Sequence, residues 1–177
     1  NDTARKSKAI ALAREGFDGK ACATLTSTGL ARENTANATK MRSLHPRAPI
    51  PTKKHSNVLA LPPDIDTELV YKCLRGFPAG TAPGPTGMRV QHILDAFNPG
   101  HKTTVLEQLT ALIVLLARGS APDELAPHLA GAKLFAATKK DGGVRPIDVG
   151  EALRRLVAKV LCETSKGSAR KYLWPLQ

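Results

Sequence analysis

The chain has 177 residues, of which 42% are hydrophobic and only 4% aromatic, so we expect a core built mainly from Leu, Ala, Val and Ile. Its 26 Lys and Arg residues against 15 Asp and Glu give a formal net charge of +11. Such an excess favours an anionic partner, nucleic acid first and an acidic membrane surface second. The longest apolar run, residues 109–117, is far shorter than the roughly 20 residues that span a bilayer, so the sequence predicts no transmembrane segment.

The basic residues are concentrated at the two ends of the chain. Residues 1–55 hold 11 Lys and Arg against 4 Asp and Glu, and residues 133–177 hold 10 against 4. The middle, residues 56–132, holds 5 against 7. An anionic partner would therefore be steered to the ends.

The cysteines and the N-terminus bear on compartment and processing. Cys22, Cys73 and Cys162 are far apart and lack metal-ligand spacing, which favours free thiols in a reducing compartment and predicts no metal site. The chain begins at Asn1 without an apolar signal core, which suggests a processed or partial product. We therefore expect an intracellular protein of the nucleus or cytoplasm, or of an organelle assembly.

Residues 1–44 are expected to form a helical N-terminal region. Helices are predicted over residues 3–14 and 18–28, and a third from a cap at Asn34 to Leu44. Residues 45–63 contain five prolines, which fix φ and remove amide donors, so this segment is predicted to be an extended linker.

The next segment alternates helices with a glycine- and proline-rich loop. Asp66 can cap a helix over residues 66–75, and the loop at 76–87 contains four Gly and three Pro. Helices are then expected over 88–97 and 102–118. The second is apolar nearly all round at 109–117, which predicts burial on more than one side.

After residue 132 the pattern changes to that of a β-hairpin. Short β-rich runs at 133–138 and 144–149 flank a tight Asp-Gly-Gly turn at 141–143. Pro146 requires an edge strand or an unpaired position, and a helix is predicted over 151–163. The fold class is therefore mainly α with a small antiparallel β-hairpin or sheet, that is, α+β.

The hairpin carries the clearest chemical signal in the sequence. It can present Lys139, Lys140 and Arg145 at one tip, where an Arg fork matches phosphate oxygens and Lys supplies a mobile point charge. This suits a triphosphate or a nucleic-acid backbone. A solvated basic hairpin without a ligand is the alternative.

Two segments in this region resemble motifs of a known family. The first reads KLFAATKKDGGVRPIDVGEALRRLVAKVL and resembles the paired fingers motifs of reverse transcriptases of the non-LTR retrotransposon type. The second reads GTAPGPTGMRVQHI and is similar to the motif that precedes them in those RNA-directed DNA polymerases. Their order and distance also match, and the N-terminal 45 residues are similar to the lead-in of some retroelement proteins.

The resemblance implies that residues 64–177 form a fingers-like region. Lys139 and Arg145, with Lys140 as a weaker candidate, would bind the phosphates of a nucleotide. The residues that would lie against the template strand are Gly84, Pro85, Gly87, Pro146, Ile147, Arg154, Arg155 and Lys159. For the glycine loop a plain turn, and for the helix residues a solvated face, are the alternatives.

The sequence also departs from the family. Thr81 stands where the family usually has Lys, and Thr86 where it usually has Asp, so the loop loses two charges. The chain contains no Asp-Asp pair, the motif with which the family's palm holds two divalent metals. We therefore expect no catalytic or metal-binding residue here and no activity from this chain alone, with Mg²⁺ needed only in a complete polymerase. The expected ligand is RNA or an RNA–DNA hybrid.

A second interpretation belongs to another class of function. The chain can be a non-catalytic structural or interaction subunit of a larger assembly, derived from a retroelement fragment. The apolar helix 102–118 would then dock a protein partner.

Overall fold

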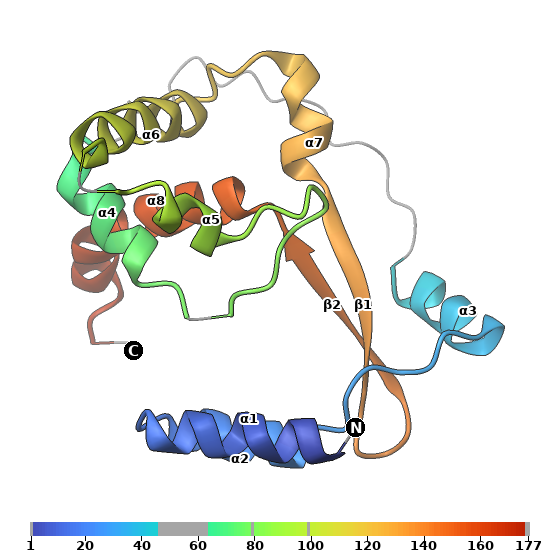
Figure 1. The fold of residues 1–177 in the computed structure, drawn as a ribbon. Helices are drawn as coiled ribbons and strands as arrows, with labels where there is room; N and C mark the ends of the chain where they lie inside the picture. The colour runs from blue at the N-terminus through green and yellow to red at the C-terminus, as the bar shows by residue number, and fades with distance from the viewer. Residues whose placement is uncertain (1, 46–63, 79, 99, 176–177) are drawn as a thin grey trace. The chain divides into compact units, whose positions relative to one another are not determined.

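The computed structural model describes residues 2–45, 64–78, 80–98 and 100–175. It is mainly helical with one two-stranded antiparallel sheet, which confirms the predicted α+β class (Figure 1). Nearly all of the predicted linker at 45–63 lies outside the described residues.

The described residues fall into two compact units. The first contains residues 2–45 and 135–147, and the second contains residues 64–134 and 148–175. The distal part of the hairpin thus groups with the N-terminal helices, so the compact units do not coincide with the segments expected from chain order.

The first unit holds three helices. These are α1 (Asp2–Arg14), α2 (Asp18–Thr26) and α3 (Thr35–Leu44). Helices α1 and α2 pack side by side (Figure 1). Each helix buries one small residue, Ala9 in α1 and Ala21 in α2. The predicted cap of α3 is confirmed, since the Asn34 side chain accepts a hydrogen bond from the Asn37 N–H at 2.8 Å.

The second unit is built around four helices. They are α4 (Thr67–Arg75), α5 (Val90–Asp95), α6 (Lys102–Ala117) and α8 (Ala152–Leu173), which surround one core (Figure 1). Between α6 and the sheet lie a short 3-10 turn, η1 (Asp123–Leu125), and α7 (Ala126–Ala130), which the sequence analysis did not predict.

The core of the second unit comes from apolar stripes at helical spacing. Ala152, Leu156 and Val160 follow one another at every fourth position of α8 and are fully buried. They pack with Val70, Cys73 and Leu74 of α4, Val90 of α5, and Leu109 and Ile113 of α6. Asp66 caps α4 as predicted, accepting from the Leu69 N–H at 2.7 Å.

Two predictions about these helices were wrong. Helix α6 is buried on one side only, because Leu112 and Leu115 on its outer side are 38% and 39% exposed. Helix α8 runs ten residues beyond the predicted end at Glu163, to Leu173. Once the first turns of α8 have formed around the buried stripe, each further residue adds one backbone hydrogen bond and costs little additional conformational entropy.

The hairpin has the two predicted strands, β1 (Ala132–Thr138) and β2 (Val144–Gly150). A short segment of the first unit adds to the free side of β1, where Leu30 forms an antiparallel bridge with Ala137. The Ala31 N–H donates to the Ala136 carbonyl at 2.8 Å, and the Thr138 N–H to the Gly29 carbonyl at 3.0 Å. Residues 28–31 therefore act as a short third strand.

Candidate phosphate-binding groove

The hairpin tip is closed by a tight turn that exposes its basic residues. The Gly142 N–H donates to the Lys139 carbonyl at 3.1 Å, and the Lys139 N–H donates to the Gly143 carbonyl at 2.8 Å. Gly142 has φ +80°, a conformation that glycine adopts at little cost. Asp141 Oδ1 accepts from the Gly143 N–H at 3.0 Å, so this carboxylate is turned into the loop.

The three predicted phosphate ligands share one groove. Its volume is about 590 Å³, and Lys139, Lys140 and Arg145 are among its lining residues. The lining also includes the end of α2 and the segment after it, up to residue 30. All of these residues belong to the first compact unit.

The contribution of residues 26–30 to this groove was not predicted from the sequence. Helix was predicted through residue 28, whereas α2 ends at Thr26 and Ser27 is already extended, with ψ 130°. The run of Thr and Ser before Gly29 was the available signal, because these residues favour strands and turns over helix interiors.

The hydroxyl groups of this segment differ in what they can offer a ligand. The Thr26 hydroxyl donates to the Cys22 carbonyl at 3.0 Å, and the Thr28 hydroxyl donates to the Thr138 carbonyl. Ser27 Oγ accepts from the Gly29 N–H at 3.1 Å, so its own O–H remains a donor. The segment after α2 therefore offers the groove one unused hydroxyl donor, that of Ser27, beside three cationic side chains.

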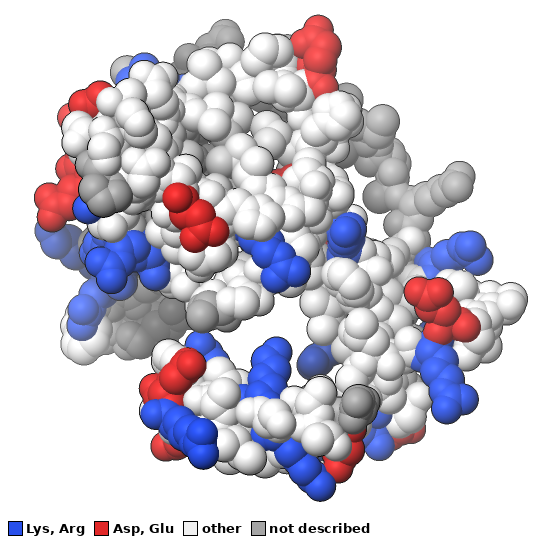
Figure 2. Space-filling view, viewed as in Figure 1, with Lys and Arg blue, Asp and Glu red and all other residues white. Residues whose placement is uncertain are grey.

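No carboxylate among the described residues pairs with the three cations. Lys139, Lys140 and Arg145 are exposed, and the ion pairs found in these parts of the chain lie elsewhere. On the second unit Lys and Arg side chains also gather over α4 and the neighbouring end of α8 (Figure 2). There, however, Lys72 and Lys166 face Glu163 at 3.0 and 3.8 Å.

The predicted template loop is held firmly against the start of α8. Both oxygens of the buried Glu151 carboxylate are used, Oε1 by the Thr86 N–H at 2.7 Å and Oε2 by the Thr86 hydroxyl at 2.8 Å. A Cβ on Gly84 would lie 2.7 Å from the Glu151 Cα, and Gly87 has φ +83°, so both positions require glycine. Pro85 is exposed beside them.

The three basic residues predicted on the last helix make contacts within the second unit. Arg154 donates to the Ala130 carbonyl at 2.8 Å, and Arg155 donates to the Ala82 carbonyl at 2.6 Å. The Lys159 Nζ lies 4.5 Å from the centre of the Phe77 ring. Part of each side chain's binding capacity is therefore used inside the fold.

The remaining predicted residues lie on β2. Pro146 is half-buried, and Ile147 is exposed and lines the groove of the hairpin tip. Ile147 thus joins Lys139, Lys140 and Arg145, whereas the loop and α8 residues predicted to bind template belong to the second unit.

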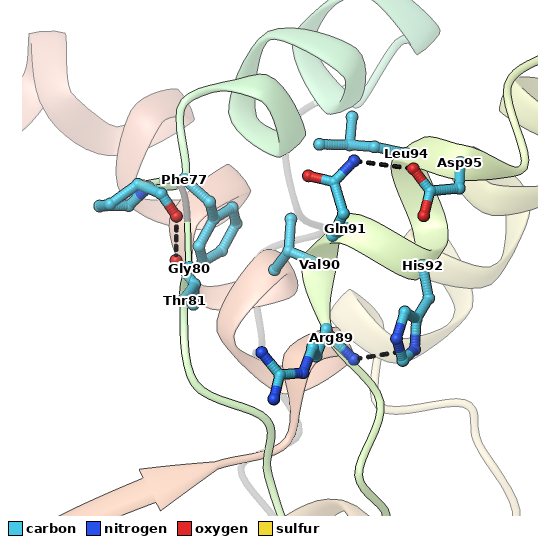
Figure 3. A pocket seen from close by; sticks show the side chains of 10 residues that line it. Phe77, Gly80, Thr81, Arg89, Val90, Gln91, His92, Leu94 and Asp95 are labelled. Atoms are coloured by element: carbon cyan, nitrogen blue, oxygen red, sulfur yellow. Dashed lines mark hydrogen bonds between the residues drawn. The ribbon is translucent and has the colours of Figure 1, made fainter. Parts of the chain in front are cut away.

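A second pocket, of about 350 Å³, lies in the second unit between the loop after α4 and helix α5 (Figure 3). Phe77 and Thr81 line it from the loop, and Arg89 and Gln91 from the start of α5. No pocket was predicted at these residues from the sequence.

The described part of the chain contains neither a candidate metal site nor a helix that could span a membrane. No group of three or more His, Cys, Asp or Glu side chains there could hold a metal ion. None of the described helices is long and apolar enough to cross a membrane.

No protein-family model, curated protein or solved structure matches this chain. The likeness to reverse transcriptases therefore rests on the sequence motifs alone.

Proposed function

We propose that this chain binds the phosphate backbone of a nucleic acid, RNA or an RNA–DNA hybrid, through the groove at the hairpin tip. The observation that carries the proposal is the convergence of Lys139, Lys140 and Arg145 on one groove without a carboxylate partner among the described residues. Uncompensated cations on one face are the electrostatic footprint of an anion site.

The chemistry of the groove favours phosphate over a simple carboxylate. Arg145 offers a planar fork for two oxygens, and the two lysines offer mobile ammonium groups that can follow successive phosphates. The free Ser27 hydroxyl adds a neutral donor. At about 590 Å³ the groove is wide enough for a stretch of backbone rather than a single ion.

The resemblance to reverse transcriptases supports the same ligand class. In that family the matching Lys and Arg hold the phosphates of an incoming nucleotide, and the glycine loop approaches the template. We propose these roles for Lys139 and Arg145, and for the exposed Pro85 and Gly87. For Arg154, Arg155 and Lys159 the proposal is weaker, because their internal contacts use part of their donors.

A second function, as an interaction subunit, is favoured by a specific surface. Leu112 and Leu115 are exposed on α6, and an apolar groove of about 370 Å³ is lined in part by Leu116 of the same helix. The groove is lined by Leu116, Ala126, Leu129, Ala130, Arg154, Val157, Ala158 and Leu161. Exposed apolar surface of this kind is typical of protein docking sites. Sedimentation with and without Leu112→Lys/Leu115→Lys would detect self-association through this surface.

The experiment that tests the nucleic-acid proposal compares two double variants. We expect Lys139→Ala/Arg145→Ala to weaken binding to a labelled RNA–DNA primer–template at low salt by about a hundredfold or more, since each of the two charge-assisted bonds contributes about 1.5–3 kcal/mol. The control Arg170→Ala/Lys171→Ala removes the same charges from the exposed end of α8 and should change the affinity much less. Equal losses in both variants would contradict a site at the hairpin.

A further inference from the structure

The pocket beside α5 is lined from the loop after α4 and from the helix itself, and each of the two contributes apolar and polar residues. The loop after α4 contributes Phe77 and Thr81, and α5 contributes Val90 and Gln91 (Figure 3). Phe77 and Val90 point toward one another, and the Arg89 guanidinium lies in the gap between loop and helix. The volume of about 350 Å³ falls within the range of small-molecule binding sites.

The pocket has one unpaired guanidinium group. Arg89 is exposed and forms no ion pair with any residue that the structure describes. Its backbone N–H donates weakly to His92 Nδ1 at 3.4 Å, which leaves the His92 Nε2 available to a ligand. The Lys159 Nζ lies over one face of the Phe77 ring, 4.5 Å from its centre, so this contact already uses that face and adds a second positive charge near the pocket. An anionic group is the complement of this end.

The other polar groups of the pocket include donors and acceptors, and one of them, the Asp95 carboxylate, only accepts. The Gln91 Nε2 donates to Asp95 Oδ1 at 2.7 Å, and this leaves the second amide hydrogen and the Gln91 Oε1 free. The Thr81 hydroxyl donates to the Pro78 carbonyl and keeps its acceptor capacity. A ligand edge with mixed donors and acceptors would be satisfied here.

We infer that this pocket receives one unpaired nucleotide of the bound strand, an inference that rests on the proposed nucleic-acid function. A nucleotide combines a flat ring for Phe77, a base edge with donors and acceptors for Gln91, and a phosphate for the Arg89 fork. Bases of single strands are bound by stacking on aromatic side chains, while Arg matches phosphate bidentately. Inorganic phosphate or a sugar alone would leave the ring and the amide unused.

The test follows the backbone amide signals of Thr81, Arg89 and Gln91 by NMR while the four ribonucleoside 5′-monophosphates are added singly to the full chain. We expect saturable shifts at these amides with at least one monophosphate. Inorganic phosphate alone should give markedly weaker binding. Equal binding of inorganic phosphate would overturn the nucleotide assignment.

Two variants and one control locate the binding. Arg89→Ala and Phe77→Leu should each weaken monophosphate binding by about tenfold, because one removes the phosphate fork and the other the stacking ring. Arg118→Ala removes a charge from an exposed position of the same unit and should leave the affinity unchanged. Matching amide spectra elsewhere would show that the variants are folded.

The two proposals fail in different ways. If the chain binds primer–template through the hairpin but no monophosphate shifts the three amides, the pocket inference is overturned and the proposed function stands. If neither ligand binds, the nucleic-acid function itself is wrong.

Discussion

Two residues of the glycine loop, Gly84 and Thr86, are fixed in place by contacts with Glu151 at the start of α8. Gly84 is buried against the backbone and side chain of Glu151, and Thr86 is held by both carboxylate oxygens. The threonine at this position therefore does not leave the loop loose, although it lacks the charge of the aspartate usual in the reverse transcriptase motif that this loop resembles. Its hydroxyl and its backbone N–H anchor the loop by donating one hydrogen bond to each oxygen of the Glu151 carboxylate.

Replacement of Gly84 by alanine should destabilise the protein. The new Cβ would lie within 3.0 Å of three Glu151 atoms, two of them backbone, so the loop must move. We expect a loss of about 1–3 kcal/mol in the free energy of unfolding, measured with urea. Gly100→Ala is the control, because its nearest contact is at 3.8 Å. An equal effect of both substitutions would contradict the packing argument.

The link between Thr86 and Glu151 should appear as an energetic coupling. Glu151→Ala leaves the Thr86 N–H without its partner, which costs about 1–3 kcal/mol, and Thr86→Val removes the hydroxyl. In the double variant the two losses should not add, with a coupling of about 0.5–3 kcal/mol in urea unfolding. Strict additivity would mean that the contact contributes nothing.

At the scale of elements, α8 organises the second unit. Its buried stripe contacts α4 and α6, and its first residues hold the glycine loop. Leu156→Ala should lower the free energy of unfolding by about 2–5 kcal/mol, because it leaves a cavity at a fully buried position. Leu112→Ala, on the exposed side of α6, should cost far less in the same thermal or urea unfolding experiment. Similar losses would show that the core is not where the structure places it.

The ion pair between α4 and α8 gives the stability a pH dependence. The Lys72 ammonium donates to Glu163 at 3.0 Å, which lowers the pKa of Glu163 below its ordinary 4.5 and raises the pKa of Lys72 above 10.5. The Glu163 contribution is thus present above pH 4.5 and is lost as the pH falls through the lowered pKa. The Lys72 contribution is present below pH 10.5 and is lost as the pH rises through the raised pKa.

Glu163→Gln should therefore destabilise the chain slightly at pH 7 and progressively less in acid. Both groups are exposed to solvent, so the effect is small and should shrink further at high salt. Thermal unfolding at several pH values measures it, with Glu107→Gln on α6 as the control. A difference that persists well below pH 4 would have another cause.

Features of the elements that depend on neighbouring residues could be predicted from the sequence, whereas contacts between distant segments could not. Caps at Asn34 and Asp66 and the Asp-Gly-Gly turn depend on contacts within a few residues, and all three were predicted correctly. The pairing of residues 28–31 with β1 and the grip of Glu151 on Thr86 join residues more than sixty positions apart. Neither has a local signature, so neither could be predicted.

At the scale of the whole molecule, each of the two compact units carries a candidate site of its own. The first holds the basic groove of the hairpin tip. The three cations of this groove were predicted from the sequence, but the contribution of residues 26–30 was not. The second holds the glycine loop and the pocket of Arg89. The overall charge of +11 draws an anion to the surface, but the positions where it binds depend on which cations lack carboxylate partners.

The most direct test of the central claim is the salt dependence of binding to an RNA–DNA primer–template. Phosphate contacts release counterions, so the logarithm of the affinity should fall linearly with the logarithm of salt concentration, by roughly 0.9 per contact on a duplex. Loss of Lys139 and Arg145 should reduce this slope by roughly 1–2, whereas loss of Arg170 and Lys171 should not. A steep slope that is the same in the chain and in Lys139→Ala/Arg145→Ala would contradict phosphate binding at the hairpin groove.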